Sequence, residues 1–172
     1  IRRPPRSTQG VSSAASDVYK RQLYPNTKGF DMAIDFLEMN AKAIEEFRAN
    51  DGECGPPFEG TPIVLVTMIG AKSGRELCSP LAYSTDGDDL VVIASMGGAP
   101  NNPNWYHNLV ANPDVLLEVG TEQYEATAVV TEGDERDRLY AAQAEQLPIF
   151  NKYAEKAAPR VIPVFRLVRT TN

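Results

Sequence analysis

The sequence predicts a mainly β protein with helices, an α+β fold built as a six-stranded antiparallel barrel. Six segments have strand character, and short turns rather than long crossovers join most of them. The helical segments are few and do not alternate regularly with the strands, as a parallel sheet would require. Antiparallel strands of this number favour a closed or half-closed barrel over a doubly wound sheet.

The first predicted element is a helix that starts at Phe30. Asp31 is a suitable N-cap, and Asn50-Asp51-Gly52 is a stop signal. Apolar side chains recur at the three-and-four spacing of one helix face. They are Phe30, Ala33, Ile34, Leu37, Ala41, Ile44 and Phe47.

The predicted strands follow a loop rich in glycine and proline. They cover residues 63–69, 76–84, 89–95, 114–120, 123–130 and 161–168. Asp86-Gly87-Asp88 is a strong hairpin signal between the second and third strands. Residues 104–113 fit a short helix that ends before Pro113. Thr131-Glu-Gly-Asp134 has the spacing of a capping box, with Asp in place of Glu, and predicts a helix to about Glu145. Residues 147–159 form a mixed segment with aromatic side chains.

Composition narrows the classes of function. The chain has 172 residues and a formal net charge of −6, which suits one domain with a sizeable core. The first 22 residues hold five basic side chains and one acidic one, so the rest is more acidic still. An acidic body argues against general binding to nucleic acid or anionic membrane, so any basic site is small and local.

The N-terminal segment is set apart from this body. Residues 1–22 are rich in Arg, Pro and Ser and lack periodicity, so we expect them to be disordered. They resemble a translated sequencing-adapter leader and are interpreted as non-native. Residues 23–172 are expected to form one domain. With two cysteines of no recognisable spacing and no apolar run of membrane-spanning length, a cytoplasmic location is expected.

The usual catalytic constellations are missing. His107 is the only histidine, and in a short helix it is interpreted as a structural or surface residue. The carboxylate pairs lie in turns or at helix starts, where solvation and capping explain them. No metal site is therefore predicted.

The turn at residues 70–74 is the most informative stretch. Its two glycines permit positive φ, so that successive N–H groups point to one spot, and Lys72 and Ser73 add a charge and a hydroxyl. The turn is a plausible cradle for phosphate or carboxylate, although most such turns merely join a hairpin. Its spacing is not that of a P-loop.

Two further stretches could converge with this turn. The loop from Ser95 to Gly98 follows a strand, and Trp105-Tyr106 opens a helix. Together they suit a planar, phosphorylated cofactor, with its tail on the Lys72 turn and its ring near Trp105. A core tryptophan that covers one end of the barrel is an equally good interpretation of Trp105.

An ordered series of motifs resembles the deazaflavin-dependent nitroreductase family of actinobacteria. The motifs are Gly70-x-Lys-Ser-Gly74, Ser79-Pro-Leu81, Ala94-Ser-x-Gly-Gly98, Asn102-Pro-x-Trp-Tyr-x-Asn-Leu-x-Ala-Asn-Pro113 and Arg160-x-Ile-Pro-Val164. The resemblance covers residues 30–168. It implies a split β-barrel like that of FMN-binding proteins, and hydride transfer from reduced coenzyme F420 to a quinone, a nitro compound or another electron-poor acceptor.

The resemblance also implies roles for particular residues. The cofactor site would comprise Lys72, Ser73, Gly74, Arg75, Ser79, Pro80, Ala94, Ser95, Met96, Gly97, Gly98, Asn104 and Trp105. Lys72 and Ser73 would face the phosphate and polyglutamate tail, and Ser95 the ring. Tyr153 and Ser95 are the implied catalytic residues, and Trp105, Phe150 and Tyr153 would contact the acceptor. Peripheral membrane contact would give access to lipid quinones, with the protein a monomer or homodimer.

A second hypothesis stays open. Ala71, Met96 and Phe150 stand where members of that family often have Arg, Lys and Tyr. The loss of two cations and one hydroxyl motivates a non-catalytic protein of the same fold that binds or carries F420, or FMN as the less favoured ligand.

Overall fold

The computed structural model describes the backbone of residues 30–170 and the side chains from residue 36 onward. The prediction of a disordered leader at residues 1–22 lies outside the described residues. The chain divides into two compact units, Ile1–Ala41 and Lys42–Asn172, and the second holds every strand described below.

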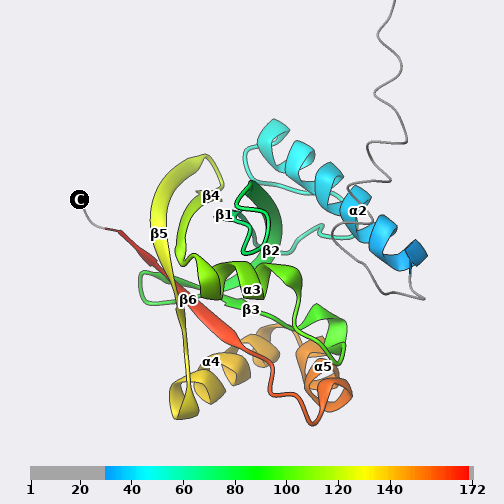
Figure 1. Ribbon diagram of the computed structural model, residues 1–172, viewed down its shortest axis with the longest axis vertical. Coiled ribbons are helices and arrows are strands. Elements are labelled where there is room, and N and C mark those ends of the chain that lie inside the picture. The colour runs from blue at the N-terminus through cyan, green and yellow to red at the C-terminus, as the bar shows by residue number, and fades with distance from the viewer. Residues whose placement is uncertain (1–29, 171–172) are drawn as a thin grey trace, which may run out of the picture. The chain divides into compact units, whose positions relative to one another are not determined.

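Six antiparallel strands close into a barrel in the order β1-β2-β3-β6-β5-β4 (Figure 1). The pairing of β1 with both β2 and β4 completes the closure. This confirms the predicted fold class and strand number. The strands are β1 (Ile63–Ile69), β2 (Glu76–Asp86), β3 (Asp89–Ile93), β4 (Asp114–Val119), β5 (Glu122–Val130) and β6 (Val164–Arg169).

Side-chain alternation explains why β1 is a nearly continuous apolar run. Val64, Val66 and Met68 point into the barrel core. Ile63 and Leu65 point the other way and pack with Phe47 from the last turns of helix α2 (Phe30–Ala49). Because both faces of the strand are covered, both sets of side chains must be apolar.

Two helices cover the outer face of β3 and β6. Helix α4 (Gly133–Gln146) and helix α5 (Ile149–Ala157) pack side by side over Val91, Ile93 and Val164 (Figure 1). The segment that the sequence left as mixed is thus mostly helix. A proline lies on either side of the amphipathic pattern, so the pattern is too short to predict the helix.

Helix α3 (Asn104–Ala111) lies across one end of the barrel. Leu109 is fully buried among the interior side chains. The Trp105 and Tyr106 rings pack against Phe165 of β6, with centroids 5.9 and 5.7 Å away. The predicted short helix is confirmed, and its apolar face closes the core.

Three local predictions were wrong. Thr131 does not cap α4, because its hydroxyl donates to the Val164 carbonyl at 2.9 Å and Glu132 is the N-cap. Gly70 does not adopt positive φ, whereas Gly74 does, at 63°. The third strand ends at Ile93 and the sixth begins at Val164, so both are shorter than predicted, although the Ala94 N–H still donates to the Pro163 carbonyl at 2.9 Å.

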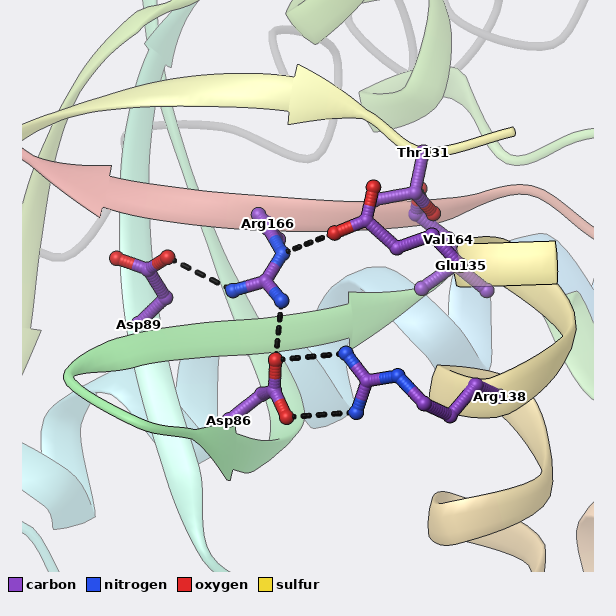
Figure 2. A network of polar contacts seen from close by, with 7 residues as sticks. All are labelled: Asp86, Asp89, Thr131, Glu135, Arg138, Val164 and Arg166. Carbon is purple, nitrogen blue, oxygen red and sulfur yellow. Dashed lines mark hydrogen bonds and ion pairs between the residues drawn. The ribbon is translucent and has the colours of Figure 1, made fainter. Parts of the chain in front are cut away.

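Charged side chains tie the β2–β3 hairpin to β6 and α4. Figure 2 shows Arg166 of β6 donating to Asp86, Asp89 and Glu135, while Arg138 of α4 donates to both oxygens of Asp86. Arg138 first, and Arg166 to a lesser extent, lower the pKa of Asp86 to about 2. This network stabilises the side of the barrel that α4 covers.

Among residues 30–170, no helix combines the length and apolar character that a membrane crossing demands. The two cysteines, Cys54 and Cys78, are free and half-buried. Burial raises the pKa of both thiols.

Candidate functional site

The turn after β1 presents the first group of predicted residues. The Gly74 N–H donates to the Gly70 carbonyl at 2.8 Å, and the left-handed Gly74 reverses the chain into β2. Lys72 and Ser73 are exposed at the tip. Within the described part of the chain, Lys72 forms no ion pair. Its ammonium group is therefore available to a ligand.

Helix α3 holds this turn from the side. The Asn108 side-chain oxygen accepts from the Ala71 N–H at 3.0 Å, and the Asn112 amide donates to the Ile69 carbonyl at 3.2 Å. Both asparagines belong to the Asn-Leu-x-Ala-Asn motif, whose hydrogen-bonding role the sequence alone did not reveal. These two asparagines thus fix the backbone immediately before Lys72.

A second turn, from Ala94 to Ala99, holds the other predicted group. Met96, Gly97 and Gly98 have φ values of 48°, 61° and 76°, so three successive residues are left-handed. A Cβ on Gly98 would lie 2.8 Å from the Tyr153 carbonyl oxygen, whereas one on Gly97 would meet nothing within 4 Å. Gly98 allows α5 to approach, and Gly97 leaves open space beside the turn.

Arg160 holds this second turn in place, a function that sequence reasoning missed. Its guanidinium donates to the carbonyls of Ala94 at 3.1 Å, Ser95 at 2.9 Å and Ala99 at 2.9 and 2.7 Å. It also donates to the Asn102 side-chain oxygen at 2.7 Å. Burial lowers its pKa. The sequence signal for it is the Arg160-x-Ile-Pro-Val motif, which does not by itself indicate the hydrogen-bond partners of Arg160.

The aromatic residues of α5 differ in exposure. Phe150 is only 8% exposed and packs edge-on against Tyr140 and Tyr153, with centroids 6.2 and 5.4 Å apart. Tyr153 is half-buried, and within the described residues its hydroxyl has no hydrogen-bond partner. Tyr153 is therefore better placed than Phe150 to reach a ligand. Trp105 is half-buried, with one side on the barrel core.

The structure brings most of the predicted residues to the two ends of α3. The Lys72 turn contacts its C-terminal half, and the loop from the Ser95 turn leads into Asn104 and Trp105 at its N-terminus. A helix of 8 residues is about 12 Å long, which suits an elongated ligand. Ser79 and Pro80 lie on opposite faces of β2, so both cannot contact a ligand through one face.

The outer face of β1, β4 and β5 carries a separate open groove of about 490 Å³. Its lining includes Ile69, Leu116 and the carboxylates of Glu76, Asp114 and Glu125. None of the predicted site residues lines it. In residues 36–170, no group of His, Cys, Asp and Glu side chains is arranged to hold a metal ion.

The fold is a six-stranded split barrel in which an exposed lysine turn is hydrogen-bonded to helix α3 and a left-handed glycine turn precedes that helix. The profile of the F420H(2)-dependent quinone reductase family matches residues 40–169. The chain therefore belongs to this family and is an oxidoreductase that depends on coenzyme F420.

Individual relatives agree. An F420H(2)-dependent quinone reductase of Mycobacterium tuberculosis is 35% identical over 126 residues, which is 72% of this chain and 85% of the relative. A solved F420-H2 dependent reductase, FDR-A, superposes with a TM-score of 0.57 at 38% identity, over 62% of this chain and 93% of that one. A second structure, described as a domain-swapped dimer, has a TM-score of 0.59 and 34% identity, over 77% of this chain and 97% of that one.

The residues at both ends of α3 fit this cofactor. An unpaired lysine suits its anionic tail, and the exposed Gly97, where a Cβ would meet nothing within 4 Å, leaves the second turn accessible to a ligand.

Proposed function

We propose that this oxidoreductase binds reduced F420 along α3 and passes a hydride to a quinone or a similarly electron-poor acceptor. The observation that carries the proposal is the placement of the unpaired Lys72 and the Ser95–Gly98 turn at opposite ends of one helix. When bound, the cofactor supplies the hydride, and the protein supplies orientation and charge.

Each part of the site then has a task. Lys72, with the Ser73 hydroxyl, holds the anionic tail, and Trp105 borders the ring. The Ser95 side chain and the backbone at Gly97 face the ring. Tyr153 reaches the acceptor with its unpartnered hydroxyl. Hydride and one proton together convert a quinone into its hydroquinone, and the Tyr153 hydroxyl is the proposed proton donor, refilled from solvent.

The decisive variant is Lys72→Ala. Loss of a charge-assisted contact should weaken F420 binding by about 1–3 kcal/mol, or roughly five- to 150-fold. The chain has a single tryptophan, so quenching of Trp105 emission reports binding directly. Lys42→Ala is the control, because Lys42 is an exposed lysine paired with Glu46. Equal affinities for parent and Lys72→Ala would remove Lys72 from the site.

Turnover needs its own measurement. Reduced F420 is mixed with the protein and menadione, and reappearance of the oxidised deazaflavin is followed by absorbance. We expect reoxidation well above the rate without protein, and slower reoxidation for Tyr153→Phe with unchanged F420 affinity. Tight binding without reoxidation would replace this proposal by the carrier hypothesis.

Access to lipid quinones would require contact with a membrane surface. Val161 is 70% exposed beside Arg160, and Met96 is 44% exposed in the turn that Arg160 holds. We propose that these two apolar side chains provide a peripheral contact. Flotation with phosphatidylcholine vesicles should recover the parent protein but not the variant with both residues changed to Ser. Equal recovery of the two would discard the contact.

A further inference from the structure

The hydrogen bonds of Arg160 are unusual for a half-buried arginine. All five go to oxygens of residues 94–102, and none goes to a carboxylate. By contrast, Arg48, Arg138 and Arg166 each pair with at least one acidic side chain. The positive charge of Arg160 is therefore hydrogen-bonded but not neutralised by any described residue.

These bonds divide the turn into an acceptor side and a donor side. Besides the three carbonyls held by Arg160, the Gly97 carbonyl accepts from Lys156 at 3.3 Å and the Met96 carbonyl from the Ala99 N–H at 3.1 Å. The N–H groups of Met96 and Gly97 donate to no acceptor among residues 36–170. Five of the six carbonyls in the 94–99 turn are thus occupied, and two backbone donors remain available.

The backbone conformation makes this arrangement dependent on its supports. A left-handed Met is unfavourable, and such residues persist where the surroundings over-determine them. Arg160 contacts residues on both sides of the left-handed run, Ser95 before it and Ala99 after it. It therefore closes the turn as a clamp.

We propose that Arg160 is a positioning residue of the hydride-transfer reaction. It holds the 94–99 turn so that the Met96 and Gly97 N–H groups face the carbonyl-bearing edge of the ring, and its charge behind the turn favours the electron-rich reduced cofactor over the oxidised one. This inference rests on the proposed function, because it takes the ring to bind at this turn.

Asn102→Asp separates the charge of Arg160 from its geometry. The new carboxylate keeps the size of the amide and its acceptor position, 2.7 Å from the guanidinium in the parent, but neutralises the charge. We expect an unchanged or raised Tm together with an affinity for reduced F420 that falls about tenfold relative to that for oxidised F420. Both affinities are measured anaerobically by Trp105 quenching.

Arg160→Lys tests the clamp. A lysine keeps the charge but cannot donate to several carbonyls in the fork geometry, so both affinities should fall together. Arg136→Lys is the matched control, because Arg136 also donates two bonds to a backbone carbonyl, that of Ile162 at 2.9 and 2.6 Å. We expect it to lower Tm and leave F420 binding intact.

The outcomes discriminate cleanly. An unchanged ratio of reduced to oxidised affinity in Asn102→Asp overturns the electrostatic part, and unchanged affinities in a folded Arg160→Lys overturn the positioning part. If Arg160→Lys does not fold, Asn102→Asp alone decides. Failure of the parent protein to bind either form of F420 would instead refute the proposed function.

Discussion

Two arginines near β6 differ in the kind of acceptor that holds the guanidinium group. Arg166 lies on the strand and donates to the carboxylates of Asp86, Asp89 and Glu135 (Figure 2). Arg160 lies four residues before the strand and donates to backbone carbonyls and one amide oxygen. The first guanidinium is neutralised, and the second keeps its charge.

From this difference we expect the cluster around Arg166 to serve stability and Arg160 to serve cofactor binding. A neutralised cluster links a hairpin, a strand and a helix, so its loss should weaken the fold without altering the cofactor site. A charge held by carbonyls fixes a turn and acts on whatever binds there. Variants on the two sides should therefore differ in what they change as well as in how much.

The largest expected effect is at the turn that Arg160 holds. Gly98→Ala places a methyl group 2.8 Å from a backbone oxygen of α5 at a φ of 76°, and should cost about 3 kcal/mol of unfolding free energy. Gly97→Ala, at 61° but in open space, should cost about 1 kcal/mol. Urea unfolding measures both. Similar losses of unfolding free energy for the two variants would contradict this prediction, because α5 would then have shifted to accommodate the methyl group at Gly98.

Next in size is the carboxylate cluster. Arg166→Gln removes the half-buried guanidinium that pairs with three carboxylates and should cost about 2 kcal/mol. F420 affinity should not change, unlike in Arg160→Lys. Urea unfolding beside a quenching titration checks both statements. A fall in affinity comparable to that of Arg160→Lys would erase the distinction between the two arginines.

A smaller effect is expected at Thr131, which joins α4 to β6 beside the cluster. Thr131→Val leaves the Val164 carbonyl without the buried hydroxyl donor and should cost about 1 kcal/mol. Asp134→Ala is the comparison, since the capping role predicted for that position is absent, and it should cost only a few tenths through the helix dipole. Thermal melting of the two variants tests this order. A larger loss of Tm for Asp134→Ala than for Thr131→Val would support the capping box instead.

The smallest difference depends on pH. The pKa of Asp86 is lowered to about 2, so this carboxylate contributes stability above its unfolded pKa of about 4 and loses it as pH falls through 2. Asp86→Asn should be less stable than the parent at pH 6, with the gap closing between about pH 4 and 2. For Arg160→Lys the gap should stay constant over that range, because no carboxylate in the described part of the chain pairs with Arg160. Urea titrations at each pH test this, and a pH-independent gap for Asp86→Asn would contradict it.

The described regular structure was largely predictable because its signals are local. Strand β1, the hairpin at Gly87 and helix α3 follow from β-branched runs, a turn dipeptide and a proline stop. Helix α5 was not predicted, since nine residues between prolines carry little periodicity and gain their stability from packing on α4 and the 94–99 turn.

The sequence by itself determined the barrel class, the acidic body with one small cationic turn, and the motif series that indicated an F420-dependent oxidoreductase. Only the tertiary structure decided that Asn108 and Asn112 brace the Lys72 turn, that Gly98 meets α5, and that Arg160 closes the second turn. These contacts join residues about 37 to 66 positions apart, so no local pattern encodes them. The sequence shows an arginine but does not show whether carboxylates or carbonyls surround its guanidinium. These partners, which the tertiary structure supplies, decide whether its charge is neutralised or left to act on a ligand.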